Sequence, residues 1–511
     1  MHVETEARRK GTWLATSSDT ALLLLIAAAT ILLHALTNSR YGFHRDELAT
    51  VDDAHYLAWG YVAYPPVTPF IARLAIAMFG SSLVGLRFFA SLAQGVAIVL
   101  SGCMARRLGG KRTAQLAAAL AVAIAPVSMA AGALFQYVTF DYLWWVLTAY
   151  CMIRLLDSED ARWWLAIGAA IGLGMLTKYT MGFLAVGIAI AVLLTPARRY
   201  LKSGWLWAGM ALSLAIILPN VIWQAQHNFI SLDFLNHIHA RDIRIGRTKN
   251  FLIEQLFVPA NPVTIPMWAA GLWYYFSRKG KQFRPIGWMF VTVFLLFFAA
   301  RGRGYYMAPA YPMLLAAGAV AWEKRLETLS PARAHVRRIA GWTAIAAGAA
   351  LAVAVVVPIA PVGSALWQLG SKVQDDWREE IGWPDLVAAV ARVRDSLPAE
   401  DRANVKILAG NYGEAGAVDL YGAAYGLPKA ISGTNSFWLR GYGDPPPEVL
   451  IVTGLSRRFV DLHFNSCQLA GHVTNRFGVL NEESRDHPDI FVCRGNREPW
   501  PEFWNKIKNY G

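Results

Sequence analysis

The sequence predicts a polytopic α-helical membrane protein, with about eleven transmembrane helices and a small C-terminal α/β domain outside the membrane. Of its 511 residues, 55% are hydrophobic and only 16% are charged, whereas soluble domains have about 25% charged residues. This composition excludes intrinsic disorder and argues against a soluble multidomain enzyme, because so much apolar surface could not all be interior. The other two observations are long apolar runs and a net charge of +13.

Long apolar runs define the membrane spans, since a helix needs about 20 apolar residues to cross the hydrocarbon core. The first run, 20–36, is not closed by a clear small-residue cleavage site, so we expect an uncleaved first span rather than a signal peptide. Ten further spans are expected near 83–104, 113–131, 138–156, 162–177, 179–195, 204–222, 258–276, 286–300, 305–321 and 339–358. Two short spans meet at Lys178 and predict a helical hairpin.

Alternate connections between these spans are rich in Lys and Arg, which marks the cytoplasmic side. The basic segments are 8–10, 106–112, 198–202, 278–284 and 324–338. We therefore expect a cytoplasmic N-terminus over residues 1–19 and a transmembrane catalytic part over 20–358. Two outer loops, about 37–82 and 223–257, and the tail 359–511 would then be extracytoplasmic.

This topology explains where most of the net charge of +13 lies. The cytoplasmic segments carry most of the excess of Lys and Arg, and the basic and acidic residues of all other segments nearly cancel. The excess therefore faces anionic lipid, and it gives no support to a nucleic-acid partner.

The tail 359–511 is mixed in polarity and predicts alternating short strands and helices. β-like runs occur at 405–409, 449–453 and 490–493, and Trp383-Pro384 is typical of a helix start. Gly410, Gly413 and Gly416 follow the first β-like run without the dinucleotide-binding spacing. A plain loop is therefore favoured there over a phosphate-cradling loop.

The four cysteines divide between two environments. Cys103 and Cys151 lie in expected spans and predict packing roles. Cys467 and Cys493 both lie in the tail, where an oxidising compartment would permit a disulfide, but the sequence leaves their pairing open. No Cys or His spacing is typical of a structural zinc site.

The first outer loop holds the adjacent carboxylates Asp46 and Glu47, preceded by His44 and Arg45. A carboxylate beside the bilayer is well placed to act as a general base towards an acceptor hydroxyl or amine. Arg45 could keep that carboxylate ionised or bind an anion. The alternative is a solvated, charged loop without a chemical role.

Further ionisable residues lie at span ends on the same predicted side. Asp141 and Lys178 are functional candidates because charges near hydrocarbon are costly. Their structural alternatives are an acid at a helix N-terminus and a snorkelling lysine. Arg301 and Arg303 break the positive-inside pattern and precede Tyr305-Tyr306, so an anionic headgroup or a pyrophosphate-like group would explain them. The alternative is a basic loop without a chemical role.

The second outer loop is basic and holds His237 two residues before His239. That spacing suits no particular metal geometry on a helix, so a substrate-contacting loop is favoured over a metal site.

Taken in order, these motifs resemble the polytopic GT-C glycosyltransferases of the protein O-mannosyltransferase and lipid A aminoarabinose transferase type. The resemblance covers roughly residues 15–325. It rests on Arg45-Asp46-Glu47, Tyr64-Pro65-Pro66, Arg106-Arg107-Leu108-Gly109-Gly110, Asp141, Gly174-Met175-Leu176-Thr177-Lys178 and the segment from Tyr305 to Pro312. Relatives of the aminoarabinose type place a Lys beside the Pro-Pro pair, where this chain has Tyr64. The phosphate contact must then come from elsewhere, or the donor differs.

The resemblance implies transfer of a sugar from a polyprenyl-phosphate donor to a lipid, protein or cell-envelope glycan. Asp46 would be the base, with Glu47 and Asp141 as further acidic residues of the catalytic set. Substrate contacts would come from His44, Arg45, Tyr64, Lys178, His237, Arg301, Arg303, Tyr305 and Tyr306.

The donor carries its own phosphate leaving group, so no nucleotide or other cofactor is required. A divalent metal on Asp46 and Glu47 is left open. We expect a multi-pass protein of the bacterial inner membrane with a periplasmic tail. The main alternative is a transporter or flippase for lipid-linked saccharides, but such proteins keep charges mid-span between repeats. A non-catalytic scaffold would leave Asp46, Asp141 and Lys178 unexplained.

Overall fold

The structure is a computed structural model that describes residues 2–511, with side chains described from residue 18 onward. The chain forms two compact units. Unit 1 comprises Met1–Thr37, Arg87–Ile222 and Arg241–Val357, and unit 2 comprises Asn38–Leu86, Trp223–Ala240 and Pro358–Gly511. The first outer loop and part of the second therefore fold with the tail. The basic side chains at 8–10, which support the predicted orientation, lie outside the described residues.

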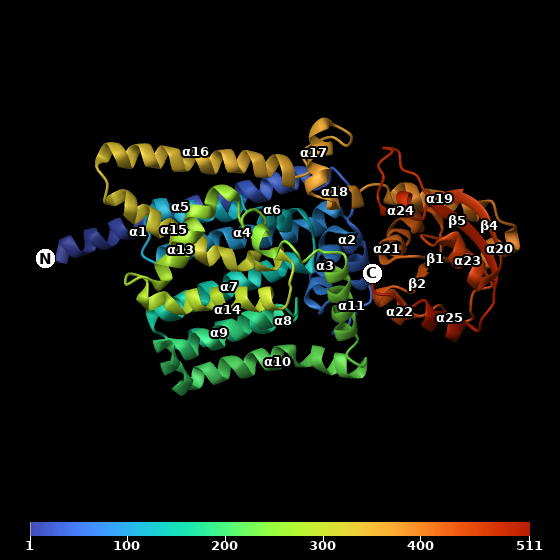
Figure 1. The fold of residues 1–511 in the computed structure, drawn as a ribbon, viewed down its shortest axis with the longest axis horizontal. Helices are drawn as coiled ribbons and strands as arrows, with labels where there is room; N and C mark the ends of the chain where they lie inside the picture. Colours follow the sequence, from blue (N-terminus) through green and yellow to red (C-terminus); the bar gives the residue numbers. More distant parts are fainter. Residues whose placement is uncertain (1) are drawn as a thin grey trace. The chain divides into compact units, whose positions relative to one another are not determined.

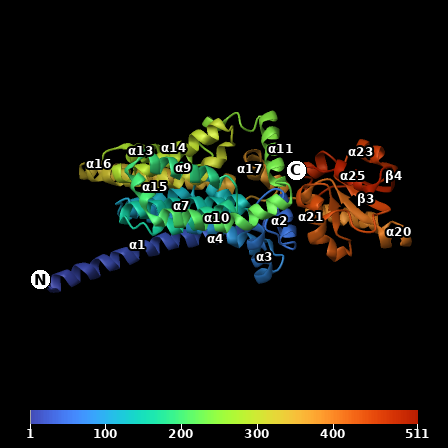
Figure 2. The same cartoon turned by 90° about the horizontal axis from the view of Figure 1, so that it is seen from below.

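Unit 1 is helical, and a helix overlaps each of the expected spans. The helices are α1 (His2–Thr37), α4 (Leu83–Arg107), α5 (Arg112–Ala123), α6 (Pro126–Ala133), α7 (Tyr137–Ser158), α8 (Trp163–Met175), α9 (Met181–Leu194), η1 (Pro196–Lys202), α10 (Gly204–Gln226), α12 (Phe251–Glu254), η2 (Pro262–Thr264), α13 (Ile265–Phe276), η3 (Lys281–Phe283), α14 (Arg284–Ala299), η4 (Gly304–Ala310), α15 (Tyr311–Glu327) and α16 (Pro331–Val356). They run side by side, with α10 and α16 at opposite margins (Figure 1). In Figure 2, α1 follows the lower margin of the same unit.

Within residues 18–511, five helical segments are long and apolar enough to cross a membrane, and seven if two bent pairs each count as one span. The bent pairs are α5 with α6, at 62°, and α9 with η1, at 103°. Several expected spans are made of shorter helices, such as the 13 residues of α8. Pro126 explains one break, since proline fits the first turn of α6 but cannot continue α5. The count of about eleven spans stays a prediction.

Large apolar side chains cover the outer faces of the marginal helices of unit 1. Leu25 of α1, Leu214 of α10 and Leu351 of α16 are 64%, 60% and 64% exposed. Faces of this kind would be costly in water and are typical of helices that contact lipid. The inner helices pack closely through glycine: a methyl group on Gly271 of α13 would lie 1.9 Å from the Leu314 carbonyl oxygen of α15. Small residues permit such backbone contact between membrane helices.

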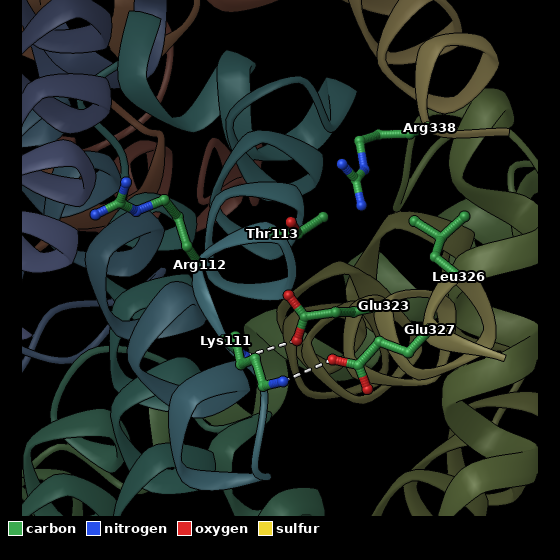
Figure 3. Close-up of a pocket in the computed structure, with 7 residues that line it drawn as sticks. All are labelled: Lys111, Arg112, Thr113, Glu323, Leu326, Glu327 and Arg338. Atoms are coloured by element: carbon green, nitrogen blue, oxygen red, sulfur yellow. Dashed lines mark hydrogen bonds and ion pairs between the residues drawn. The ribbon is translucent and has the colours of Figure 1, made fainter. Parts of the chain in front are cut away.

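A cavity of about 250 Å³ lies in unit 1 among the basic segments that flank α5, α15 and α16 (Figure 3). Glu323 accepts hydrogen bonds from the backbone amides of Lys111 and Ala114, at 2.6 and 3.0 Å. The Lys111 ammonium pairs with Glu327 at 2.8 Å. The lining charges therefore largely satisfy one another, and none of the predicted site residues lines this cavity.

Unit 2 contains a five-stranded mixed sheet in the order β2-β1-β3-β5-β4. The strands are β1 (Lys406–Ala409), β2 (Ala430–Ser432), β3 (Val449–Thr453), β4 (Phe464–His472) and β5 (Asp489–Asn496). β1 pairs in parallel with β2 and β3, whereas β5 runs antiparallel to both β3 and β4. Cys467 and Cys493 lie opposite each other on β4 and β5, and their sulfur atoms are bonded.

Helices cover both faces of this sheet. α23 (Arg457–His463) and α25 (Trp500–Lys506) supply Val460, Phe503 and Trp504 to the core of one face. α19 (Trp383–Asp395) contacts β3, β4 and β5, and α21 (Tyr412–Tyr421) contacts β1. The remaining helices are α17 (Ala365–Val373), α18 (Asp376–Glu379), α20 (Ala399–Asn404), η5 (Gly422–Tyr425), α22 (Asn435–Arg440) and α24 (Glu482–Arg485). The expected strands coincide with β1, β3 and β5, and the helix start at Trp383 is confirmed.

The first outer loop supplies α2 (Arg45–Asp53) and α3 (Val67–Phe79) to unit 2, and α11 (Ile230–Arg244) begins there. α2 packs against α21 of the tail. The expectation of a plain loop at the tail glycines is wrong for Gly413 and Gly416, because both lie in α21. A methyl group on Gly416 would come within 2.9 Å of the Leu48 carbonyl carbon. The glycines therefore allow two helices to approach at backbone distance.

Candidate functional site

The first group of site residues lies at the N-terminus of α2 in unit 2. His44 is the N-cap, and its ring nitrogen accepts a hydrogen bond from the Asp46 amide at 3.2 Å. The Glu47 carboxylate reaches back to the His44 amide at 2.9 Å and is fully buried. This reciprocal capping box satisfies amide groups that would otherwise be unpaired at the helix start. Glu47 and His44 therefore stabilise the start of α2. Asp46 is better placed than Glu47 to react with a substrate.

Asp46 keeps 32% of its side chain exposed. Its Oδ1 accepts a hydrogen bond of 2.7 Å from the Tyr412 hydroxyl, at the start of α21. A carboxylate that is both anchored and accessible can receive a proton in a fixed geometry.

Arg45 forms ion pairs with carboxylates of the tail. Its guanidinium pairs with Glu482 and lies 3.3 Å from Glu379 and 4.0 Å from Glu483. The charge of Arg45 is therefore balanced by acidic residues that sequence reasoning did not single out. Its expected role as a direct substrate contact stays a prediction.

Glu483 is the most buried acid of this cluster, and neither of its carboxyl oxygens has a hydrogen-bond partner among the described residues. Burial raises the pKa of Glu483 to about 8, the neighbouring Glu414 adds to the rise, and Arg45 opposes it. The side chain therefore holds a proton in the folded protein at neutral pH.

We expect Glu483→Gln to reduce a pH-dependent loss of stability. The pKa of Glu483 is raised in the folded state, so the unfolded chain releases this proton near its ordinary pKa of 4.5, while the folded chain keeps it up to about pH 8. Wild-type stability should then fall as the pH rises from about 4.5 to 8, and the variant should show a shallower slope, to which Asp53, Glu414 and Asp419 still contribute because burial raises their pKa values as well. Thermal unfolding midpoints at pH 5 and pH 8 test this, with the exposed Glu448→Gln as the control. Parallel wild-type and Glu483→Gln curves would contradict it.

Tyr64 lies in a second buried polar group of unit 2. Its hydroxyl donates a hydrogen bond of 2.7 Å to Asp53, and Asp53 and Asp52 both pair with Arg440 of α22. Both aspartates are buried. Tyr64 therefore belongs to a network that fastens α2 to the tail.

The second group of site residues lies in unit 1. Asp141 of α7 is buried, and it accepts hydrogen bonds from the Trp145 indole at 3.0 Å and from the Thr180 hydroxyl at 3.4 Å. The Asp141 carboxylate thus accepts one hydrogen bond from α7 and one from the residue that begins α9. These two hydrogen bonds hold the Asp141 carboxyl group in one orientation.

Lys178 lies between α8 and α9 and is surrounded by tyrosine rings. Its ammonium is 4.2 Å from the ring centroid of Tyr306 and 5.6 Å from those of Tyr137 and Tyr305. Ring faces attract a cation without neutralising its charge. Within residues 18–511, Asp141 is the carboxylate that acts electrostatically on Lys178, although the two side chains do not form an ion pair. The sequence motifs around Lys178 and Tyr305-Tyr306, which are far apart in the chain, thus meet.

The two arginines of the 301–304 segment differ in environment. Arg303 forms a bidentate pair with Asp242, at 2.6 and 2.7 Å, so its charge is already balanced. Arg301 is exposed and adopts a left-handed backbone conformation, with φ of 49°. Of the two, Arg301 is the arginine with its charge open to an anion.

His237 contacts Tyr510 near the C-terminus. The centroids of the two rings are 5.6 Å apart, and both residues belong to unit 2. Among residues 18–511, no three His, Cys, Asp or Glu side chains gather in a way that could hold a metal. A divalent metal on Asp46 and Glu47 stays a prediction without geometric support.

Sequence reasoning missed Tyr137, Asp242, Tyr412, Arg440 and the acidic residues around Arg45. One of them had a usable signal. Asn411 and Glu414, which follow the first β-like run, form a capping box that begins α21 and so fixes Tyr412.

The apolar outer helices of unit 1 and the ionisable groups at the helix ends define a polytopic helical membrane protein with a polar site. Residues 63–223 match the family model described as dolichyl-phosphate-mannose-protein mannosyltransferase. The fold resembles that of ArnT from Cupriavidus metallidurans bound to undecaprenyl phosphate, with a TM-score of 0.61, 15% identity, and coverage of 93% of this chain and 98% of that one. The expected resemblance to GT-C glycosyltransferases is therefore confirmed.

Curated sugar transferases are among the relatives that match in sequence. An undecaprenyl phosphate-α-4-amino-4-deoxy-L-arabinose arabinosyl transferase of Pseudomonas fluorescens is 29% identical over 32% of this chain and 30% of its own. The lipid A galacturonosyltransferase RgtD of Rhizobium johnstonii is 24% identical over 48% of this chain and 54% of its own. The matched segments thus span about a third to a half of these relatives.

Proposed function

We propose that this protein is a membrane glycosyltransferase that moves a sugar from a polyprenyl-phosphate donor to an acceptor, with Asp46 as the base. The acceptor is a lipid, a protein or a cell-envelope glycan at the outer face of a bacterial inner membrane. The observation that carries the proposal is the Lys178 ammonium, which lies among the rings of Tyr137, Tyr305 and Tyr306. The names of the sequence relatives, which are sugar transferases, support the same reaction class.

The chemistry needs two kinds of group. An acceptor oxygen or nitrogen that attacks the anomeric carbon must lose a proton to a base, and Asp46 supplies an accessible carboxylate. The departing lipid phosphate must be stabilised by cations, and Lys178 and Arg301 supply them. A single base without a covalent intermediate implies that the transfer inverts the anomeric configuration.

The proposed reaction is tested by deleting the gene and comparing the masses of envelope glycolipids and glycans. A sugar-bearing species should disappear and should return when the wild-type chain is expressed. An unchanged envelope, together with failure of the purified protein to consume any polyprenyl-phosphate sugar, would refute the transferase and favour a transporter.

We expect Lys178→Met to weaken use of the donor. Methionine keeps the length of the side chain but removes the charge, so the donor phosphate loses its cation in a site of low polarity. The KM for the donor should rise by about 10- to 100-fold, while the exposed Lys202→Met should leave it unchanged. Titration of the donor in the transfer reaction measures both, and an unaltered KM for Lys178→Met would exclude this phosphate contact.

A further inference from the structure

The tail helix α21 bears directly on the residue proposed as the base, although the two lie far apart in the sequence. Tyr412 and Asp46 are separated by 366 positions, and their side chains are joined by a hydrogen bond of 2.7 Å within unit 2. The next residue towards the N-terminus, Arg45, lies with its guanidinium 5.9 Å from the centroid of the Tyr412 ring. Tail contacts therefore converge on two consecutive residues at the start of α2.

The position of Tyr412 is fixed by its own helix. Asn411 is the N-cap of α21 and accepts a hydrogen bond from the Glu414 amide at 2.9 Å, while the Glu414 carboxylate accepts one from the Gly410 amide at 2.9 Å. Because the first turn is held in this way, Tyr412 has little freedom to move its hydroxyl away from Asp46.

Glycines bring this turn close to α2. A methyl group on Gly413 would lie 2.8 Å from the Cβ of Arg45, and one on Gly416 would lie 2.9 Å from backbone and side-chain atoms of Leu48. The two glycines are three positions apart, so they share one face of α21. The glycine pattern therefore serves a contact that sets the distance between Tyr412 and Asp46.

We infer that Tyr412 is a positioning residue for Asp46, and hence that the tail domain is part of the catalytic machinery rather than only a surface for acceptor recognition. The inference rests on the proposed function, since it requires Asp46 to act as the base. A phenol that donates a hydrogen bond to one oxygen of a carboxylate holds the whole carboxylate in one orientation. An orientation that is lost costs rate without weakening donor binding.

The test is Tyr412→Phe, which removes only the hydroxyl. We expect kcat to fall by about 10- to 100-fold, with the KM for the donor and the thermal unfolding midpoint unchanged. Tyr425→Phe, an exposed tyrosine of the same domain, is the matched control and should keep the wild-type kcat. A structural role for Tyr412 would instead lower the unfolding midpoint.

A double variant separates this inference from the proposed function. In the Asp46→Asn background, Tyr412→Phe should have no further effect on the residual rate, because the hydroxyl acts through the carboxylate. Additive losses, or a wild-type kcat for Tyr412→Phe, would overturn the inference while leaving Asp46 as the base. Full activity of Asp46→Asn alone would instead overturn the proposed function.

Discussion

Asp46→Asn is expected to reduce sugar transfer by at least about 100-fold, because an amide cannot accept the proton that a general base removes. The substitution is nearly isosteric, and an asparagine oxygen can still accept the hydrogen bond from Tyr412. Folding and membrane insertion should therefore be preserved, and the loss should appear in kcat. The rate of transfer from a labelled polyprenyl-phosphate sugar, measured in proteoliposomes, gives the result.

Two controls define what the loss of activity means. Asp461→Asn makes the same chemical change at an exposed residue of the tail, which pairs with Arg457 one helical turn away, and it should keep the full rate. Glu47→Ala should lower stability, since it removes the carboxylate that accepts the His44 amide hydrogen bond at the start of α2. If Asp46→Asn folds, inserts and transfers sugar at the normal rate, Asp46 is not the base.

Arg440→Met is expected to lower the free energy of unfolding of unit 2 by about 3–5 kcal/mol, the usual cost of leaving buried charge uncompensated. Arg440 pairs with both Asp52 and Asp53, and these aspartates are buried. Its guanidinium also lies 4.5 Å from the ring centroid of Tyr56. Methionine retains apolar contact but leaves two carboxylates without a cation. Denaturation in detergent micelles, followed by near-ultraviolet circular dichroism, measures the change.

The matched control is Arg457→Met, which breaks an exposed pair with Asp461 and should cost less than about 1 kcal/mol. Adding Asp53→Asn to Arg440→Met removes one of the orphaned charges, so part of the lost stability should return. Equal losses for Arg440→Met and Arg457→Met would show that the buried network does not hold α2 to the tail.

The sequence located Asp46 and Glu47 but could not separate their roles. Both are acids in one short motif, and the difference between them depends on which carboxylate turns back to the His44 amide. The capping geometry makes Glu47 part of the helix and leaves Asp46 exposed. A local motif predicts where a helix begins more readily than which of two adjacent acids remains available to a substrate.

The sequence also identified each basic residue of the site without the side chains that contact it. Lys178, Arg301 and Arg303 are all basic residues near span ends, yet Asp242 balances only Arg303, and tyrosine rings surround only Lys178. The partners come from distant segments, and the sequence has no pattern that links them. The expectation of a plain loop at Gly413 and Gly416 was wrong for a similar reason. The helix that these glycines approach begins at Arg45, and no sequence pattern links the two segments.

What the sequence determined by itself is the class of protein and the position of its ionisable motifs. The length and polarity of a run along the chain are one-dimensional properties, and the thickness of the bilayer sets how long an apolar run must be to span it. Tertiary structure decided which charges are balanced, which carboxylate is accessible and that Tyr412 meets Asp46. Those outcomes depend on distances of a few ångströms between side chains that are hundreds of residues apart, and electrostatic and hydrogen-bond energies change over that range.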